Sequence, residues 1–447
     1  MSEATEMGEA ADSGEVLDSG EAADSGEVLD SGEAADSGEV LDSGEAADGH
    51  SATTAHGWGG LARYVIAATL ARTSDGGAVV AVVLLVTTGG GPGWLAGLLG
   101  ACITAPHLLG PFVARTLDTA RDGRTVIAGA CVVHGTTLAA AVLLYPVTHP
   151  AVTAVLLIVS GLVGPLLTGG ISSRLPAIAG EGRQRQRRAQ GWDVATYGIG
   201  GTIGPTVVAA VSAWTSPLTA VLVLAAGTFL AAAVIRFLPY APPPAAAADV
   251  PRPGRTLLGI LASGPLRRTL YLTVTVAFGV AALPITAVAS ARTLGVDNAA
   301  AGVLTAAYGL GNLAGSAGVM IRPARGDADR LMTRLALPIA ATLALITLTH
   351  TFAIAVVAYA AAGIANSYFF AATLAARNEY APDAARGQIF VWVGALKITA
   401  GSAGTAVAGA LIGTALALPL ILAVVLTLGS ALISLAERHR LEPQPES

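Results

Sequence analysis

Residues 61–87 read LARYVIAATLARTSDGGAVVAVVLLVT, a stretch of 27 residues in which only Arg63, Arg72 and Asp75 carry a charge. A helix needs about 20 predominantly apolar residues to cross the hydrocarbon core of a bilayer. This stretch is long enough to cross it. It therefore predicts a membrane-spanning helix.

Eleven further apolar stretches of spanning length follow it, separated by short breaks. They are 93–114, 124–146, 150–173, 189–212, 216–239, 267–291, 298–321, 331–349, 351–376, 387–413 and 415–436. The longest break, 240–266, comes after the sixth stretch and predicts a central loop outside the membrane. We therefore expect an all-α polytopic membrane protein of twelve helices, six in residues 59–239 and six in residues 267–436.

The charge of the chain is divided between two unlike parts. Hydrophobic residues make up 53% of it and charged residues only 12%, against about a quarter charged in an ordinary soluble domain. Residues 1–50 hold 16 Asp or Glu and no Lys or Arg, so the formal net charge of −5 combines an acidic tail with a body of net +11.

Within the tail, residues 11–22 are repeated unchanged as 23–34 and 35–46. The composition predicts disorder over 1–58, as a tail that either contacts basic loops or is merely solvated.

The basic residues of the body predict its orientation. If the N-terminus is cytoplasmic, 22 of the 25 Lys and Arg residues fall at inner helix ends and loops. The outer loops 87–93, 145–150 and 214–217 carry none, and Arg292 is the exception. Since positive residues are retained on the cytoplasmic side, we expect a multi-pass protein of the cell membrane with both termini inside, including the C-terminal tail 437–447.

Several classes of protein are disfavoured by what the sequence lacks. A P-loop needs a lysine after glycine, and the only lysine, Lys397, follows Leu396 inside an apolar stretch. No H-E-x-x-H or G-x-S-x-G occurs, and no two of the seven histidines have the spacing of metal ligands. The basic residues are explained by topology. We therefore expect no ATP, cofactor, metal or nucleic-acid binding, and no enzyme.

Charged residues inside a bilayer are costly and are functional candidates by default. Arg72 and Asp75 lie near the middle of the first span, three residues apart and hence on one helix face. Either Asp75 binds a proton under the influence of Arg72, or the two form a fixed ion pair. Lys397 lies in the eleventh span, where it has two possible roles. Its side chain faces a cavity between the helices, to bind an anionic group or to pair with Asp75, or it extends to the cytoplasmic surface.

Neutral polar residues within the spans form a second set of candidates. Tyr197, Asn312 and Asn366 are possible contacts for a substrate. Most such residues make hydrogen bonds between helices, and that remains the alternative for all three.

The two halves also resemble each other. Five residues recur at an offset of 200, since Trp192, Ala195, Gly201, Gly204 and Ala210 fall on Trp392, Ala395, Gly401, Gly404 and Ala410. The register predicts an internal duplication of six spans, a design in which the substrate site lies between the halves.

With these features, residues 59–436 resemble the major facilitator superfamily. The family's loop motif between its second and third spans reads G-x-x-x-D-R-x-G-R. Residues 114–124, ARTLDTARDGR, carry a degenerate form with Ala114 at the glycine, then Asp118, and Arg121, Gly123 and Arg124 after two extra residues. The resemblance implies that this loop gates the cytoplasmic side by pairing between helices.

The fifth span resembles the antiporter motif of that superfamily, G-x8-G-x3-G-P-x2-G-G. Gly191, Gly200, Gly204 and Pro205 stand at its spacings, while Val208 and Ala209 replace the last two glycines. The likeness is to drug:proton antiporters and implies export. The family's arginine within the fourth span is missing, which leaves Arg72 or Lys397 to substitute for it.

The sequence thus predicts a secondary transporter that alternates access by rocking one half against the other. Its expected partners are a small apolar or amphipathic substrate, the proton gradient and the lipid bilayer, and its expected action is proton-coupled efflux. Two alternatives stay open: an importer or uniporter without proton coupling, and a transporter-like sensor that does not transport.

Overall fold

The structure is a computed structural model that describes residues 48–243, 246–297 and 301–441, with side chains from residue 59 onward. Packing divides the chain into two units, 1–50 and 51–447, and the account below concerns the second. Of the tail predicted to be disordered, 1–58, residues 1–47 lie outside the described residues, so their disorder stays a prediction. For residues 48–58 the prediction is wrong, because they form the start of α1.

The first half contains six spans, two of which are broken into shorter helices. Its elements are α1 (Asp48–Thr88), α2 (Gly93–Thr104), η1 (Ala105–Leu109), α3 (Gly110–Thr119), α4 (Gly123–Leu144), α5 (Pro150–Pro165), η2 (Leu166–Gly170), α6 (Leu175–Ala179), α7 (Arg183–Trp214) and α8 (Pro217–Arg236). The breaks have local causes, because Pro106 enters η1 and Pro165 ends α5 just before the π-helical turn η2. Pro205, in contrast, lies within an unbroken α7.

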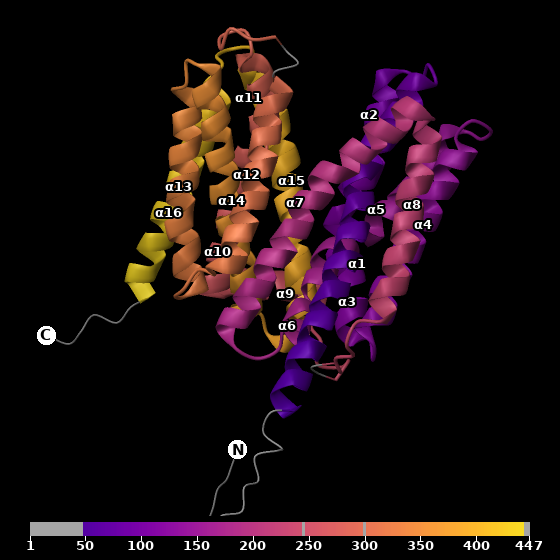
Figure 1. Cartoon of the computed structure of the whole chain (residues 1–447), viewed down its shortest axis with the longest axis vertical. Helices are drawn as coiled ribbons and strands as arrows, with labels where there is room; N and C mark the ends of the chain where they lie inside the picture. Colours follow the sequence, from indigo (N-terminus) through magenta and orange to yellow (C-terminus); the bar gives the residue numbers. More distant parts are fainter. Residues whose placement is uncertain (1–47, 244–245, 298–300, 442–447) are drawn as a thin grey trace, which may run out of the picture. The chain divides into compact units, whose positions relative to one another are not determined.

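The second half begins with a short helix in the central connection and continues with six further spans. Its elements are α9 (Pro253–Ala262), α10 (Gly264–Val280), α11 (Leu283–Ser290), α12 (Ala301–Ile321), α13 (Ala328–Thr347), α14 (Phe352–Tyr380), η4 (Asp383–Ala385), α15 (Arg386–Ile412) and α16 (Leu418–Leu441). The first span of this half is α10 together with α11, which Pro284 separates near its start. Figure 1 shows these helices in the colours of the sequence.

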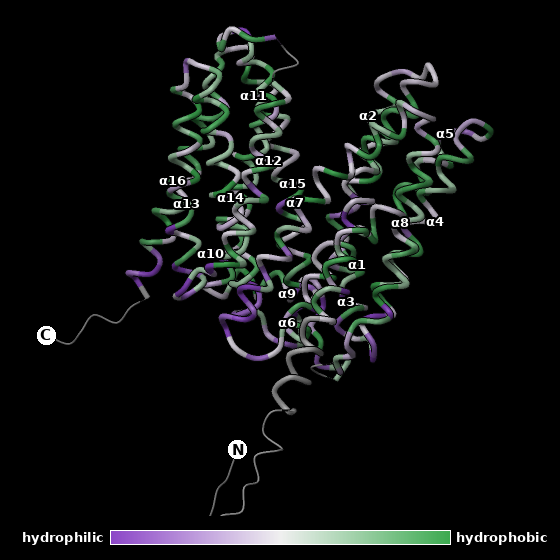
Figure 2. Tube along the Cα trace, in the orientation of Figure 1, coloured by the Kyte–Doolittle hydropathy of each residue, from purple (hydrophilic) through white to green (hydrophobic). Residues whose placement is uncertain are grey.

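Eleven spans in the described part of the chain are long and apolar enough to cross a membrane. The remaining predicted span, 298–321, corresponds to α12, whose 21 residues include five glycines, Tyr308 and Asn312. Figure 2 shows the apolar residues spread along the middle of the helices. The all-α fold of two six-helix halves is confirmed.

Most of the apolar core lies within one half or the other. In the second half it is formed mainly by α10 to α14 with α16, and in the first half by two clusters centred on Leu166 and on Leu138. A smaller cluster joins the halves and contains Val194 of α7, Val319 of α12 and Phe370 of α14. Because each half has its own core, the junction between them is the place where a site can form without unfolding either.

The duplication predicted from the offset of 200 residues appears in the packing of α7 and α15. A Cβ added at Gly204 would meet backbone atoms of α1, including the Gly77 nitrogen at 2.8 Å. A Cβ added at Gly404 would likewise meet the backbone of Phe278, in α10. The fifth helix of each half therefore crosses the first at close range, where only glycine fits.

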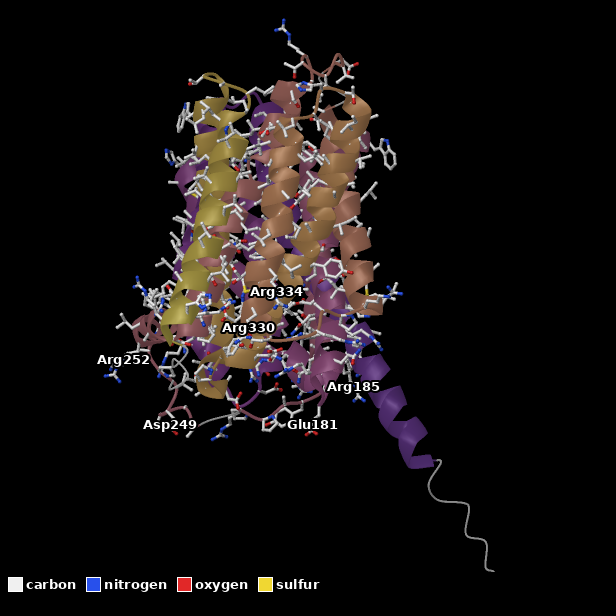
Figure 3. All side chains as sticks on the ribbon, turned by 90° about the vertical axis from the view of Figure 1, so that its left-hand side faces the viewer. Glu181, Arg185, Asp249, Arg252, Arg330 and Arg334 are labelled. Carbon is white, nitrogen blue, oxygen red and sulfur yellow. The ribbon has the colours of Figure 1, made fainter. Side chains whose placement is uncertain are left out.

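Charged residues gather at one end of the helices, which we call the charged end; among the described residues it comprises 120–122, 180–182, 237–243, 246–252, 322–327 and 381–385. Figure 3 labels six residues toward that end: Glu181, Asp249 and Arg252 from two of these loops, Arg185 from the start of α7, and Arg330 and Arg334 from the start of α13. Hydrogen bonds join the loops to the helices, for example from Arg124 to the Leu238 carbonyl at 2.9 Å. The bases that the sequence assigns to one side of the membrane thus lie together.

Candidate functional site between the two halves

A buried polar network surrounds Arg72 of α1 and Asp193 of α7. Arg72 Nη1 lies 2.7 Å from Asp193 Oδ1, and both side chains are almost fully buried. Tyr64 donates to the same carboxylate oxygen at 2.6 Å, and Ser172 donates to the other at 2.8 Å. Arg72 also donates to Thr196 and to Ser172. The charges of this pair are therefore compensated and hydrogen-bonded, as burial requires.

The predicted pairing of Arg72 with Asp75 is wrong. The two residues share a helix, but a Cβ at Gly200 would lie 2.7 Å from the Arg72 Cβ, so α7 passes directly beside Arg72. That close crossing brings the carboxylate of Asp193 to the guanidinium. Asp75, one turn further along, faces other helices.

Asp75 faces a histidine instead. Its Oδ1 lies 3.7 Å from Nε2 of His107, in η1, and that oxygen is buried without a hydrogen-bond partner. His107 Nδ1 lies 3.0 Å from the Ile103 carbonyl, which can only accept, so Nδ1 carries a hydrogen. Nε2 is thus the position at which this ring gains or loses a proton, and it is directed at the Asp75 carboxylate.

Lys397 of α15 lies against aromatic rings rather than at the membrane surface. Its Nζ is 3.7 Å from the centroid of Phe370 and 5.7 Å from that of Tyr197. Among the described residues it makes no ion pair and no hydrogen bond, so the predicted alternative of a pair with Asp75 is wrong in this conformation. The side chain is half-buried.

Arg377 of α14 is a second cation in this region without a carboxylate. Its side chain is 1% exposed, and its Nε and Nη2 atoms are buried without hydrogen-bond partners among the described residues. Its guanidinium carbon lies 5.8 Å from the ring centroid of Phe390. Arg377 follows Phe370 by seven residues, so both lie on one face of α14.

Of the three neutral polar candidates, Tyr197 alone touches the charged residues. Arg72 stacks on its ring at 3.6 Å, and Phe370 meets it edge-to-face with centroids 5.0 Å apart. Asn366 donates to Asn312 at 2.9 Å, an interhelical hydrogen bond between α14 and α12. The two asparagines thus contact each other, and their role toward a substrate stays untested.

At the charged end, Asp118 joins the two halves. Its carboxylate accepts from the backbone N–H groups of Gly387 at 2.8 Å and Gln388 at 2.9 Å, in the first turn of α15. The N-terminus of a helix carries partial positive charge and unpaired N–H groups, so a buried carboxylate is well placed there. The loop predicted to act as a gate therefore holds an inter-half contact.

The other three residues of that loop motif lie near it but make different contacts. Arg124 pairs with Asp122 at 3.0 Å, and a Cβ at Gly123 would clash with the guanidinium of Arg174 at 2.6 Å. The side chain of Arg121 is exposed. Of Asp118, Arg121, Gly123 and Arg124, it is Asp118 whose side chain hydrogen-bonds to the other half in the described residues.

A second contact at the charged end links α7 to the second half. Arg187 pairs with Glu379 at 2.8 Å and donates to the Ala324 carbonyl at 2.7 Å. Asn378 donates to Gln186 at 2.7 Å beside it. Together with Asp118, these bonds hold the halves together at this end, and we call them the charged-end seal.

The antiporter-like glycines occupy the two interfaces of α7. Gly191 packs on α12, where a Cβ would lie 2.9 Å from the Met320 nitrogen, and Gly200 and Gly204 pack on α1. Any larger side chain at these positions would separate the helices. α7 is therefore the helix through which α1 and the second half are mechanically linked.

Sequence reasoning missed Asp193, His107 and Arg377. Asp193 had a usable signal, because it is a carboxylate inside the predicted span 189–212. His107 was noticed only as an isolated histidine, since its partner comes from another helix. Arg377 is one of the 22 basic residues that the sequence places at cytoplasmic helix ends and loops, whereas in the structure it is buried in the last turns of α14.

Comparisons with known proteins support the fold rather than a particular identity. No family model matches the sequence, and no curated protein matches it. Solved structures do: the human organic anion transporter MFSD10 (TETRAN) is similar at a TM-score of 0.66 and 16% identity, covering 84% of this chain and 99% of that one.

Two further structures have the same architecture. A bacterial homologue of the iron transporter ferroportin, in an outward-facing state, gives a TM-score of 0.68 at 10% identity over 85% of this chain and 99% of the other. The proton:xylose symporter XylE, bound to 6-bromo-6-deoxy-D-glucose, gives 0.65 at 13% identity over 86% and 96%. The chain therefore has the fold of the major facilitator superfamily.

Proposed function

We propose that the chain is a secondary active transporter of the cell membrane that exports a small amphipathic molecule in exchange for protons. The contact between Asp75 and His107 carries this proposal. It is a titratable pair inside a spanning helix bundle, in a fold that also serves a protein named as a proton symporter.

The geometry of the pair provides one place for a proton. With its Nδ1 hydrogen directed at Ile103, a neutral His107 would present the Nε2 lone pair to an ionised Asp75, and the two would repel. A proton on either group turns this repulsion into a hydrogen bond or an ion pair. The pair would thus bind one proton in one state and release it in another.

The surroundings of the pair are consistent with that exchange. Arg72 lies one turn away on α1 but is already bound to Asp193. His134 of α4 lies on the other side, with its Nδ1 2.9 Å from the Ser160 hydroxyl. Neither group removes the need for a proton between Asp75 and His107.

The direction and sidedness of transport rest on two further features. The glycines of α7 match an antiporter motif, and they link α1, which carries Asp75, to the second half. The cluster of arginines at the charged end favours placing that end in the cytoplasm. With the seal closed, the proposed site would face the outside, as required for the release of an exported substrate.

Everted membrane vesicles test the proposal. An imposed pH gradient, acidic inside, is followed with a pH-sensitive dye while ethidium, 8-anilinonaphthalene-1-sulfonate or an uncharged dye is added. A proton-coupled exporter dissipates the gradient on adding a substrate. We expect Asp75→Asn and His107→Gln to abolish this response, and the exposed controls Asp249→Asn and His149→Gln to keep it.

Two results would contradict the proposal in different ways. An unchanged response in Asp75→Asn would remove the proton role of the pair. Flux without any pH response in the unsubstituted chain would favour the importer or uniporter, and binding without flux would favour a sensor.

A further inference from the structure

The charges at the junction of the halves do not balance. Arg72, Arg377 and Lys397 are three cations, and Asp193, paired with Arg72 at 2.7 Å, is the carboxylate among them. The charged groups that act on the Lys397 ammonium are those of Arg377 and Arg72, which repel it. Positive charge without a counter-ion is costly at this depth in a membrane protein, so an anion is expected to bind beside it.

The aromatic partners of Lys397 compensate its charge only in part. A cation over an aromatic ring gains less free energy than the desolvation of that ion costs. Phe370 therefore positions the ammonium but leaves it able to bind a further group. The rings of Phe370 and Tyr197 meet edge-to-face, with an angle of 80° between their planes, and together provide an aromatic surface next to the ammonium.

No other carboxylate near this junction is free to take that role in the described residues. Asp75 faces His107, and Glu379 is bound to Arg187. Among the described residues the Lys397 ammonium thus has no counter-ion, which leaves it able to bind an anion from outside the chain.

There is also space for it. Gly394 precedes Lys397 by three residues and Gly201 follows Tyr197 by four, so each lies on the same helix face as its neighbour. A Cβ added at either glycine would meet no atom within 4 Å. Each open position therefore lies about one helical turn from Lys397 or Tyr197.

The depth of Lys397 fits a transport site. It lies ten residues beyond Gly387 along α15, and Tyr197 lies ten residues beyond Arg187 along α7. At 1.5 Å per residue, both are about 15 Å from the charged-end seal. This is about half the thickness of the hydrocarbon core, where transporters of duplicated halves bind their substrates.

We infer that the chain binds an organic anion between its halves, with the acidic group on Lys397 and an aromatic or apolar body against Tyr197 and Phe370. The inference rests on the proposed function, because it names the substrate class of that transporter. It narrows the proposed substrate from any small amphipathic molecule to one that carries a carboxylate or sulfonate group.

Equilibrium binding to the purified full-length chain in detergent tests this inference. The probes are 1-naphthoate, 2-naphthalenesulfonate, the uncharged 1-naphthalenemethanol and the cation 1-naphthylmethylammonium, measured by calorimetry, with sulfate as an inorganic anion. We expect the aromatic anions alone to bind saturably, and more tightly than sulfate.

Variants localise the binding. Lys397→Gln should weaken binding of the aromatic anions at least tenfold, since a hydrogen bond to a charged group is lost, whereas Lys397→Arg should keep most of it. Gly394→Leu should fill the open space and weaken binding without lowering the unfolding temperature of the ligand-free chain. Arg292→Gln, an exposed cation elsewhere, serves as the matched control.

The inference is overturned if no aromatic anion binds, if the alcohol or the cation binds equally well, or if Lys397→Gln and Gly394→Leu leave anion binding unchanged. Sulfate binding as tight as naphthoate binding would refute the aromatic part. Because equilibrium binding needs no proton gradient, these outcomes are independent of the vesicle test of Asp75 and His107.

Discussion

Arg72 and Lys397 are two cations on neighbouring aromatic rings, and they differ in how their charge is balanced. Arg72 stacks on Tyr197 and has Asp193 as its ion-pair partner. Lys397 stacks on Phe370 and has no carboxylate among the described residues. A paired buried charge stabilises a packing arrangement, whereas an unpaired one with open space beside it is ready for a ligand. The first stabilises the packing of α1 on α7, and the second is the centre of the anion site that we propose.

Removing the partner of Arg72 should have the largest effect. Asp193→Asn would leave Arg72 buried with its charge uncompensated, and we expect a loss of about 3–5 kcal/mol of stability. Thermal unfolding in detergent, followed by intrinsic fluorescence, measures it against the exposed control Asp249→Asn. Adding Arg72→Met should recover much of the loss, and a failure to recover would mean that Asp193 acts through Tyr64 or Ser172 instead.

The charged-end seal should give the next largest effect. Asp118→Ala removes both acceptors for the Gly387 and Gln388 N–H groups, at about 1.5–3 kcal/mol for hydrogen bonds to a charged group. The closed arrangement should weaken, so a cysteine introduced at Asn378 should react faster with a thiol reagent. The same cysteine beside Asp249→Ala is the control, and equal labelling rates would show that Asp118 does not hold the halves together.

Lys397 should behave in the opposite way to Arg72 in the same assay. Lys397→Met removes an unpaired cation from a partly apolar environment, so we expect stability to be unchanged or raised by about 1 kcal/mol. The detergent unfolding midpoint measures this directly beside Arg72→Met, which should lower it. A clear drop for Lys397→Met would mean that the lysine has a structural partner, and the comparison would no longer hold.

The smallest effect should come from the half-buried pair of Asp122 and Arg124 at the charged end. Arg124 hydrogen-bonds Asp122 and lowers the pKa of that carboxyl below its ordinary value. The resulting stability is present above the unfolded pKa, about 3.9, and is lost as the pH falls through the lower native pKa. Asp122→Asn should therefore cost about 1 kcal/mol or less at pH 7, and the cost should shrink as the pH falls below the unfolded pKa of about 3.9. A pH-independent difference in unfolding midpoint would contradict this.

The internal repeat explains why Tyr197 and Lys397 lie near each other. At the offset of 200, Tyr197 of α7 corresponds to Lys397 of α15. Both helices keep the glycine that crosses the first helix of their half, Gly204 and Gly404, so the two side chains approach the same region from opposite halves. The duplication therefore places one aromatic ring and one cation at equivalent positions, where a ligand can contact both.

Much of the fold could be predicted from composition and periodicity. Each apolar stretch of about 20 residues becomes a span because the bilayer leaves the backbone no other way to satisfy its hydrogen bonds. The candidates Arg72, Asp75 and Lys397 could also be predicted, since charges within spans are rare. The partners of these three residues could not be predicted from the sequence. Arg72 and Asp75 are three residues apart on one helix and are therefore close whether or not they pair, so their spacing does not reveal the partner.

The sequence by itself determined the spans, the two halves, the clustering of arginines and the short set of deep charges, all of which follow from the cost of polar groups in lipid. Only the tertiary structure decided which charges are paired. The glycine crossing of α1 and α7 brings Asp193 to Arg72, the turn at η1 brings His107 to Asp75, and Lys397 is left with aromatic rings and open space. Ion pairs form over a few ångströms, and such distances between helices are set by packing.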